Sequence, residues 1–124
     1  MSTPRIEGLE NPGALDAIAY DAKKDVVILA MYETRPWDQG EAQLLQLQEK
    51  LNAYASYALD GEMAADYPEF RDKKIRIQLR TVHEPPARAM EFVQMARQQL
   101  ELQEVTFEVI RITRSEDSDA ETET

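Results

Sequence analysis

The chain has 124 residues, with 14 Lys and Arg, 24 Asp and Glu, one His and no Cys. This length suits one domain of ordinary size, and a hydrophobic fraction of 43% supports a packed core and excludes wholesale disorder. The lack of cysteine excludes disulfides, a thiol nucleophile, a thiolate zinc site and an iron–sulfur cluster. The longest apolar run, 26–32, has the length of a strand and not of a membrane span.

Negative charge is concentrated at the C-terminal end. The formal net charge is −10, and residues 115–124 supply five acids, no base and no large apolar side chain. Such a segment cannot offset its ordering entropy by burial, so we predict a disordered acidic tail that favours solubility, with a partner-binding role as the alternative. The acidic balance argues against binding to nucleic acid or anionic membranes, because both require clustered positive charge.

The pattern along the chain predicts one α/β domain over residues 14–114. An irregular leader, 1–13, precedes it and contains two prolines and two glycines. The first residues lack the apolar stretch of a secretory signal, and the absence of cysteine fits a reducing compartment. We therefore expect a cytoplasmic protein.

The first half of the domain is predicted to form a hairpin and a long helix. Residues 14–20 and the apolar run 26–32 are separated by a polar turn, which predicts two paired strands. Asp38 and Glu41 match a capping box at a helix start, and Gly61 suits the left-handed position at its end. The buried stripe of this helix is predicted to consist of Leu44, Leu47, Leu51, Tyr54 and Ala58.

The second half is predicted to alternate strand and helix. Residues 62–73 connect with one helical turn, and 75–80 alternate apolar and polar side chains as a half-buried strand does. Pro86 favours a helix start, and a helical apolar stripe follows over 89–100. Residues 105–112 form the last strand.

The resulting order, β-β-α-β-α-β, predicts the topology. Right-handed crossovers make the last three strands parallel, with the first strand antiparallel beside the second. We expect an α+β two-layer fold, in which two helices pack on one face of a four-stranded mixed sheet.

Several motifs resemble a small family of bacterial domains of unknown function. The most specific is the run 44–54, Leu-Leu-Gln-Leu-Gln-Glu-Lys-Leu-Asn-Ala-Tyr, and the likeness spans roughly residues 14–112. That family usually has a His before the Trp, which this chain lacks. The resemblance implies the fold and a bacterial cytoplasmic origin, and it implies no chemistry. The other shared motifs are Asp16-x-Ile18-x-x-Asp21, Trp37-Asp38, Gly61 and Tyr67-Pro68.

A ligand-binding crevice is one hypothesis for the strand ends. Arg35, Trp37 and Asp38 follow the second strand, and His83 follows the third. Carboxyl ends of parallel strands share an edge where ligands often bind, so Trp37 could stack and Arg35 could clamp an anion. The alternative is structural: Trp37 packs as a staple toward Ala42, Asp38 caps the helix, and His83 makes a strand-end hydrogen bond.

A partner-binding row is the second hypothesis. Arg76, Gln78 and Arg80 stand on one face of the third strand, with Arg111 and Arg114 on a neighbour. On an acidic protein this row could receive an acidic partner. The ordinary alternative is a solvated sheet face whose charges pair with acids such as Glu108.

No sequence motif assigns catalysis. The four serines lie outside Gly-x-Ser-x-Gly turns, phosphate-binding glycine loops are missing, and a single His allows no His-based metal cluster. We expect no cofactor, no metal and no nameable catalytic residue. The leading prediction is a non-catalytic protein-interaction or accessory module that uses the sheet face or a strand edge, with a homodimer as one form of that interaction. The alternative is a small-ligand binder or enzyme.

Overall fold

The computed structural model describes residues 16–113, so the predicted leader, 1–13, and acidic tail, 115–124, lie outside the described residues. Within the described part, the predicted order of strands and long helices is confirmed, with two short helical segments in the connection after the first helix. The elements are β1 (Ala17–Asp21), β2 (Val26–Glu33), α1 (Glu41–Leu59), α2 (Glu62–Asp66), the 3-10 helix η1 (Pro68–Phe70), β3 (Lys74–Thr81), α3 (Ala87–Glu101) and β4 (Val105–Arg111).

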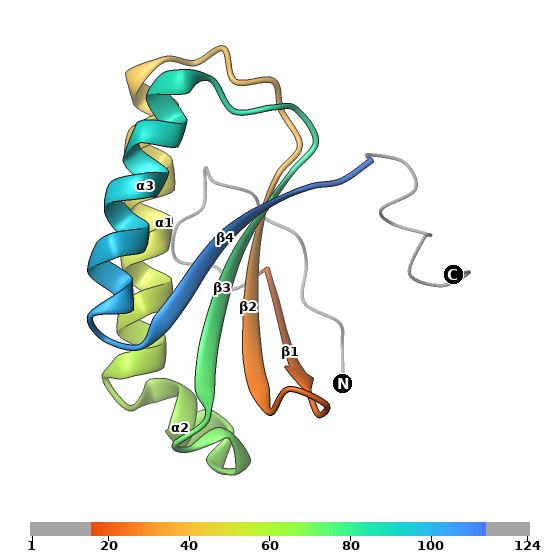
Figure 1. Ribbon diagram of the computed structural model, residues 1–124, viewed down its shortest axis with the longest axis vertical. Coiled ribbons are helices and arrows are strands. Elements are labelled where there is room, and N and C mark those ends of the chain that lie inside the picture. Colours follow the sequence, from red (N-terminus) through yellow and green to blue (C-terminus); the bar gives the residue numbers. More distant parts are fainter. Residues whose placement is uncertain (1–15, 114–124) are drawn as a thin grey trace.

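The sheet has the strand order β1-β2-β3-β4 (Figure 1). β1 is antiparallel to β2, and the pairs β2–β3 and β3–β4 are parallel. Both parallel pairs are joined through a helix, and α1 and α3 lie side by side on the same face of the sheet. The two-layer α+β fold and the mixed four-stranded sheet are therefore confirmed.

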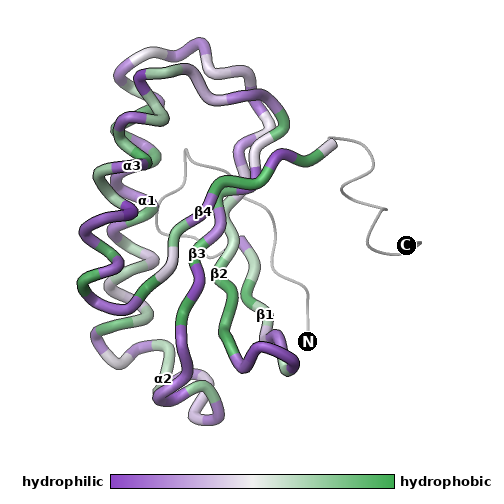
Figure 2. The backbone as a smooth tube through the Cα atoms, in the orientation of Figure 1, coloured by the Kyte–Doolittle hydropathy of each residue, from purple (hydrophilic) through white to green (hydrophobic). Residues whose placement is uncertain are grey.

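The hydrophobic core lies between the sheet and the two long helices. Every second residue of the parallel strands points to this side, because side chains alternate along a strand. The green stretches of β2, β3 and β4 in Figure 2 carry these residues. The members of the hydrophobic core, from both strands and helices, include Val27, Leu29, Met31, Leu47, Leu51, Tyr54, Ile75, Ile77, Leu79, Val93, Leu100, Val105 and Phe107.

The start of α1 differs from the predicted capping box. The N-cap is Gly40, with φ 61° and ψ −137°, and no side chain caps the helix. The Gln39 amide, which lies before the cap, donates instead to Oε1 of Gln43, 3.1 Å away. The Asp38 cap was wrong because Gly40 reverses the backbone two residues later. The helix end at Leu59, followed by Gly61 at φ 100°, agrees with the prediction.

A buried ion pair anchors α1 to the β1 end of the sheet. Nζ of Lys50 lies 3.0 Å from Oδ1 of Asp16, and both side chains are fully buried. The other carboxylate oxygen of Asp16 accepts from the Tyr32 amide at 3.0 Å. The Tyr54 hydroxyl accepts from the Asp16 amide and donates to the Ala30 carbonyl, both at 2.8 Å. The hydrogen bonds offset the cost of burying the charges, so the cluster ties helix, β1 and β2 together.

Candidate functional site

The structure brings Trp37 and the backbone of His83 together at the strand ends. The indole Nε1 of Trp37 donates to Oγ1 of Thr81 at 3.0 Å and to the His83 carbonyl at 3.2 Å. The Trp37 ring also packs against the core, while the His83 side chain is exposed. With the N-cap at Gly40, Trp37 is not in the staple position relative to Ala42. Trp37 is thus a half-buried strand-end anchor.

Arg35 is held by an internal network and is not presented as an anion clamp. Its Nε and Nη2 lie 3.0 and 2.7 Å from the two carboxylate oxygens of buried Glu33, and Nη2 also donates to Gln46 at 2.8 Å. Gln43 donates a further hydrogen bond to Glu33 at 2.9 Å. Asp38 is exposed and accepts from the side chain of Gln39. The positive charge of Arg35 is thus already matched within the domain.

A small cavity adjoins Trp37, but the other predicted crevice residues do not line it. Its volume is about 170 Å³. Ligand cavities usually measure about 300–1,000 Å³, so this space is small for a metabolite. The lining residues are Trp37, Gly40, Glu41, Gln43, Leu44, Pro86, Arg88 and Ala89.

The predicted row on β3 is present on the sheet face away from the helices. Nε and Nη2 of Arg80 donate to Oε1 of Gln78 at 3.0 and 2.8 Å, and its Nη1 donates to the Tyr32 hydroxyl at 2.7 Å. Gln78 in turn donates to Glu108 at 2.8 Å, and Nε of Arg76 lies 3.7 Å from the same carboxylate. The row is therefore a connected polar network. It resembles the alternative of a sheet face whose charges pair with acids such as Glu108.

Arg111 does not extend this row. It is in register with Thr81, so its side chain starts on the opposite side of the sheet from Arg80. Its Nε donates to the Val82 carbonyl at 3.1 Å, and its Nη1 lies 3.8 Å from Glu84. The alternation of Val105, Phe107 and Val109 along the last strand already places Arg111 on the core-facing side, a signal that the prediction did not use. Arg114 lies outside the described residues.

The outer edge of β4 is partly covered. Nε of Arg97, on α3, donates to the Phe107 carbonyl at 3.0 Å. In a parallel pair, alternate residues of an edge strand direct their backbone groups away from the neighbouring strand. Arg97 therefore occupies one of the acceptors that a further strand would need.

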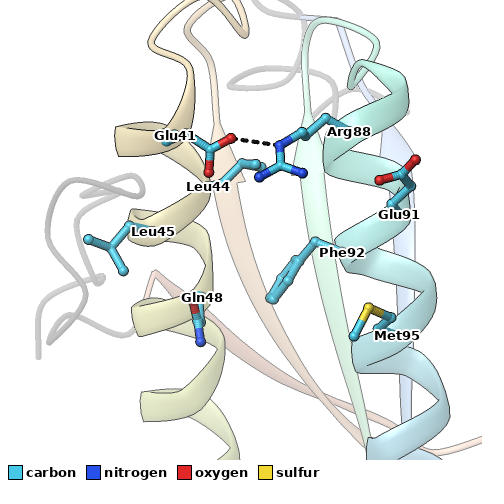
Figure 3. A pocket seen from close by; sticks show the side chains of 8 residues that line it. All are labelled: Glu41, Leu44, Leu45, Gln48, Arg88, Glu91, Phe92 and Met95. Atoms are coloured by element: carbon cyan, nitrogen blue, oxygen red, sulfur yellow. Dashed lines mark hydrogen bonds and ion pairs between the residues drawn. The ribbon is translucent and has the colours of Figure 1, made fainter.

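A groove lies between α1 and α3, on the surface away from the sheet. It has a volume of about 430 Å³ and continues into a second hollow of about 390 Å³, with Gln48, Phe92 and Met95 shared by both. Figure 3 shows Phe92 projecting into the space between the two helices. The first hollow is lined by Glu41, Leu44, Leu45, Gln48, Arg88, Glu91, Phe92 and Met95. We call the two hollows together the α1/α3 groove.

Large apolar side chains remain exposed along the α1/α3 groove. Leu45 is 54% exposed and Met95 is 63% exposed. Neither residue was predicted as exposed surface from the sequence, because both stand beside the buried stripes and not within them. Adjacent Leu44 and Leu45 were the available signal, since one helix stripe 100° wide cannot bury two consecutive leucines equally.

The charges near the mouth of the groove are predominantly negative. Nε of Arg88 lies 2.6 Å from Glu41, the ion pair drawn in Figure 3. The hydrogen bond from Arg88 lowers the pKa of the Glu41 carboxyl, and the bond to Glu41, with further attraction from Glu91, raises the pKa of Arg88. Glu91 leaves this three-residue cluster with a net negative charge.

The chain belongs to a family of unknown function, DUF6572, whose model matches residues 8–113. This confirms the resemblance to an uncharacterised family. Searches of the curated proteins and of the solved structures gave no significant match. Among residues 16–113, no three or more His, Asp or Glu side chains are grouped so that they could hold a metal ion. In the same range, no helix combines the length and hydrophobicity that crossing a membrane requires.

Proposed function

We propose that this domain is a non-catalytic protein-interaction module that binds a partner protein in the α1/α3 groove. The observation that carries this proposal is the exposure of Leu45 and Met95 along a continuous hollow that is lined by both apolar and polar side chains. Contiguous exposed apolar surface rimmed by polar residues is typical of interaction sites. Full burial of such a side chain contributes roughly 1.5–3 kcal/mol, so covering the groove is favourable.

The groove is a better interaction surface than the two predicted from the sequence. In the β3 row, Arg80 donates to Gln78 and Gln78 donates to Glu108, so a partner would have to break existing hydrogen bonds. The β4 edge has an acceptor occupied by Arg97. By contrast, Leu45 and Met95 gain apolar contacts without losing hydrogen bonds. The expected cytoplasmic, bacterial setting stays a prediction.

The test is affinity capture with matched surface variants of the full chain. Leu45→Gln with Met95→Gln removes apolar surface from the groove without changing the charge. Leu59→Gln with Leu102→Gln is the matched control, because Leu59 and Leu102 are also exposed but do not line the groove. We expect a protein that is captured by the wild-type and control domains and lost from the groove variant. Capture that is equal for all three domains would contradict the groove as the binding site.

A small-ligand role is the competing function, and its best remaining support is the cavity beside Trp37. A thermal-shift screen against metabolites, nucleotides and divalent metals tests it. A ligand at about 100 times its Kd stabilises a domain by about 2.7 kcal/mol, which would raise the melting temperature by several degrees. A reproducible shift that is lost in a folded Trp37→Ala variant would favour a ligand-binding function over the interaction module.

A further inference from the structure

We propose that the occupant of the α1/α3 groove is a cationic amphipathic helix of the partner protein, lying lengthwise between α1 and α3. This inference rests on the proposed interaction function and adds the chemical class of the partner. Three properties of the groove support it: its length, its apolar lining and the sign of the charges around it.

The length of the groove suits a helix. Its lining residues extend from Glu41 to Ala55 on α1 and from Arg88 to Gln103 at the end of α3. At 1.5 Å per residue each wall is about 20 Å long, which matches a partner helix of about 14 residues. The two walls run side by side in Figure 1, so one straight helix can contact both.

The lining of the groove suits an apolar helix face. Leu44 and Phe92 form its inner part, with exposed Met95 at the rim, whereas exposed Leu45 projects from α1 away from α3 at the outer edge of the lining (Figure 3). Helices that dock in grooves present apolar anchors at positions i, i+3 or i+4 and i+7. Methionine adapts its shape to such anchors because its side chain is unbranched and flexible.

The charges of the two helices select a cationic partner. All four acids of α1 and α3 are exposed, whereas Arg88 is the only exposed base on them. Lys50 is buried against Asp16, and half-buried Arg97 binds the Phe107 carbonyl. Arg88 itself is paired with a carboxylate. Of the acids, Glu41 and Glu91 line the groove, and Arg88 pairs with Glu41, so a lysine or arginine at the edge of a docked helix would meet the charge of Glu91. The four acids are Glu41, Glu49, Glu91 and Glu101.

Two other occupants fit these charges poorly. A second copy of the domain docked face to face would bring the same excess of acids together, which is repulsive. The segment 115–124 has no large apolar side chain for the groove and carries five further acids. Charge complementarity thus favours a separate, positively charged helix.

Three synthetic peptides test the inference directly. The first is an amphipathic helical peptide of about 14 residues with leucine on one face and lysine on the other, matching the groove length. The second replaces every lysine with glutamate. The third has the composition of the first in a scrambled order that abolishes the apolar face. Fluorescence anisotropy gives each Kd, and NMR shift mapping of the labelled full chain locates the contact.

We expect the first peptide to bind at least about 10-fold more tightly than either control peptide, which corresponds to about 1.4 kcal/mol. The shifted resonances should centre on Leu45, Phe92 and Met95. Leu45→Gln with Met95→Gln should weaken binding by about 10-fold or more, since both apolar contacts are lost. Equal binding of the scrambled peptide would mean that charge alone drives association, and it would overturn the inference.

Charge variants separate the electrostatic contribution to peptide binding from the apolar contribution. Glu41→Gln with Glu91→Gln removes the two acids that line the groove, and it should weaken binding of the cationic peptide by about 3-fold to 10-fold at low salt and by less at high salt, because exposed charges are screened. Glu62→Gln with Glu69→Gln, on α2 and η1, makes the same change in net charge away from the groove and should have a smaller effect. Equal effects of the two pairs would contradict a specific electrostatic contact.

Failure of this inference can be told apart from failure of the proposed function. If affinity capture depends on Leu45 and Met95 but the cationic peptide binds no more tightly than the control peptides, the partner class is wrong and the interaction function stands. If neither depends on the groove, both proposals fail. Sedimentation that shows a dimer lost with Met95→Gln would identify a second copy as the occupant and would also overturn the cationic-helix inference.

Discussion

Helix α1 departs from the usual arrangement of polar and apolar residues on two sides. Toward the sheet it buries the charged side chain of Lys50, and toward solvent it leaves Leu45 more than half exposed. The buried charge is matched inside the domain by Asp16 and by the hydrogen bonds around Tyr54. The exposed leucine has no comparable compensation. We infer that the buried charge, which the domain compensates, serves stability. The exposed apolar side chain, which it does not compensate, indicates a surface for a partner.

Lys50→Met should have the largest effect on stability, and it tests whether the buried charge on α1 serves stability. It removes the cation that lies 3.0 Å from the buried carboxylate of Asp16, and breaking a buried pair in this way typically costs about 3–5 kcal/mol. Urea unfolding followed by circular dichroism measures the loss. A loss under about 1 kcal/mol would mean that the pair is not a determinant of stability, since that is the usual range for surface pairs.

The double variant Lys50→Met with Asp16→Asn is the control for this prediction. It removes both charges, and the side-chain amide oxygen of the introduced asparagine can still accept from the Tyr32 amide, so we expect much of the stability to return. If the loss of stability in the double variant instead equals the sum of the losses in Lys50→Met and Asp16→Asn, then Lys50 and Asp16 act independently.

Tyr54→Phe should have the next largest effect. It removes a hydroxyl that serves one buried amide and one buried carbonyl, at Asp16 and Ala30. Leaving such groups unsatisfied costs about 1–3 kcal/mol, measurable by the same urea unfolding. A change below this range would mean that water or another group replaces the hydroxyl.

The same hydroxyl gives a pH dependence with a defined sign. Burial raises the pKa of Tyr54 above its ordinary value of 10.0. The unfolded chain therefore loses this proton first, and stability from this group is present below pH 10 and falls as the pH rises above it. Unfolding measured at increasing alkaline pH should show a steeper loss for the wild type than for Tyr54→Phe.

Trp37→Phe should have a smaller effect. It keeps the ring against the core but removes the donor to Thr81 and to the His83 carbonyl. We expect a loss of about 0.5–1.5 kcal/mol, the usual contribution of a hydrogen bond. A much larger loss would show that the strand end depends on this bond more than its geometry indicates.

Leu45→Gln with Met95→Gln should have the smallest effect on stability. This double variant tests whether the exposed apolar side chains serve binding and not the fold. Exposed positions usually change stability by less than about 0.5 kcal/mol each. The melting temperature should therefore stay close to that of the wild type while partner binding is lost. A large decrease in melting temperature would show that these side chains support the fold.

The sequence predicted the fold well because its signals are periodic. Alternation along 75–80 and the helical spacing of Leu47, Leu51 and Tyr54 reflect burial, which the structure confirms, whereas Leu44 of the predicted stripe is only half buried. The capping box failed because Gly40 overrides a local motif with backbone geometry. The pairing of Lys50 with Asp16 joins segments 34 residues apart, so local pattern carries no information about it.

The hairpin of β1 and β2 has a consequence for folding in a crowded solution. β2 is apolar on both faces, and its parallel partner β3 is reached only after the whole of α1, with Val26 beside Lys74. β1 is joined to β2 by the short turn 22–25, and such hairpins form within microseconds. One edge of the segment most prone to aggregation thus gains its neighbour before either crossover closes, which halves the exposed backbone on which a foreign strand could assemble.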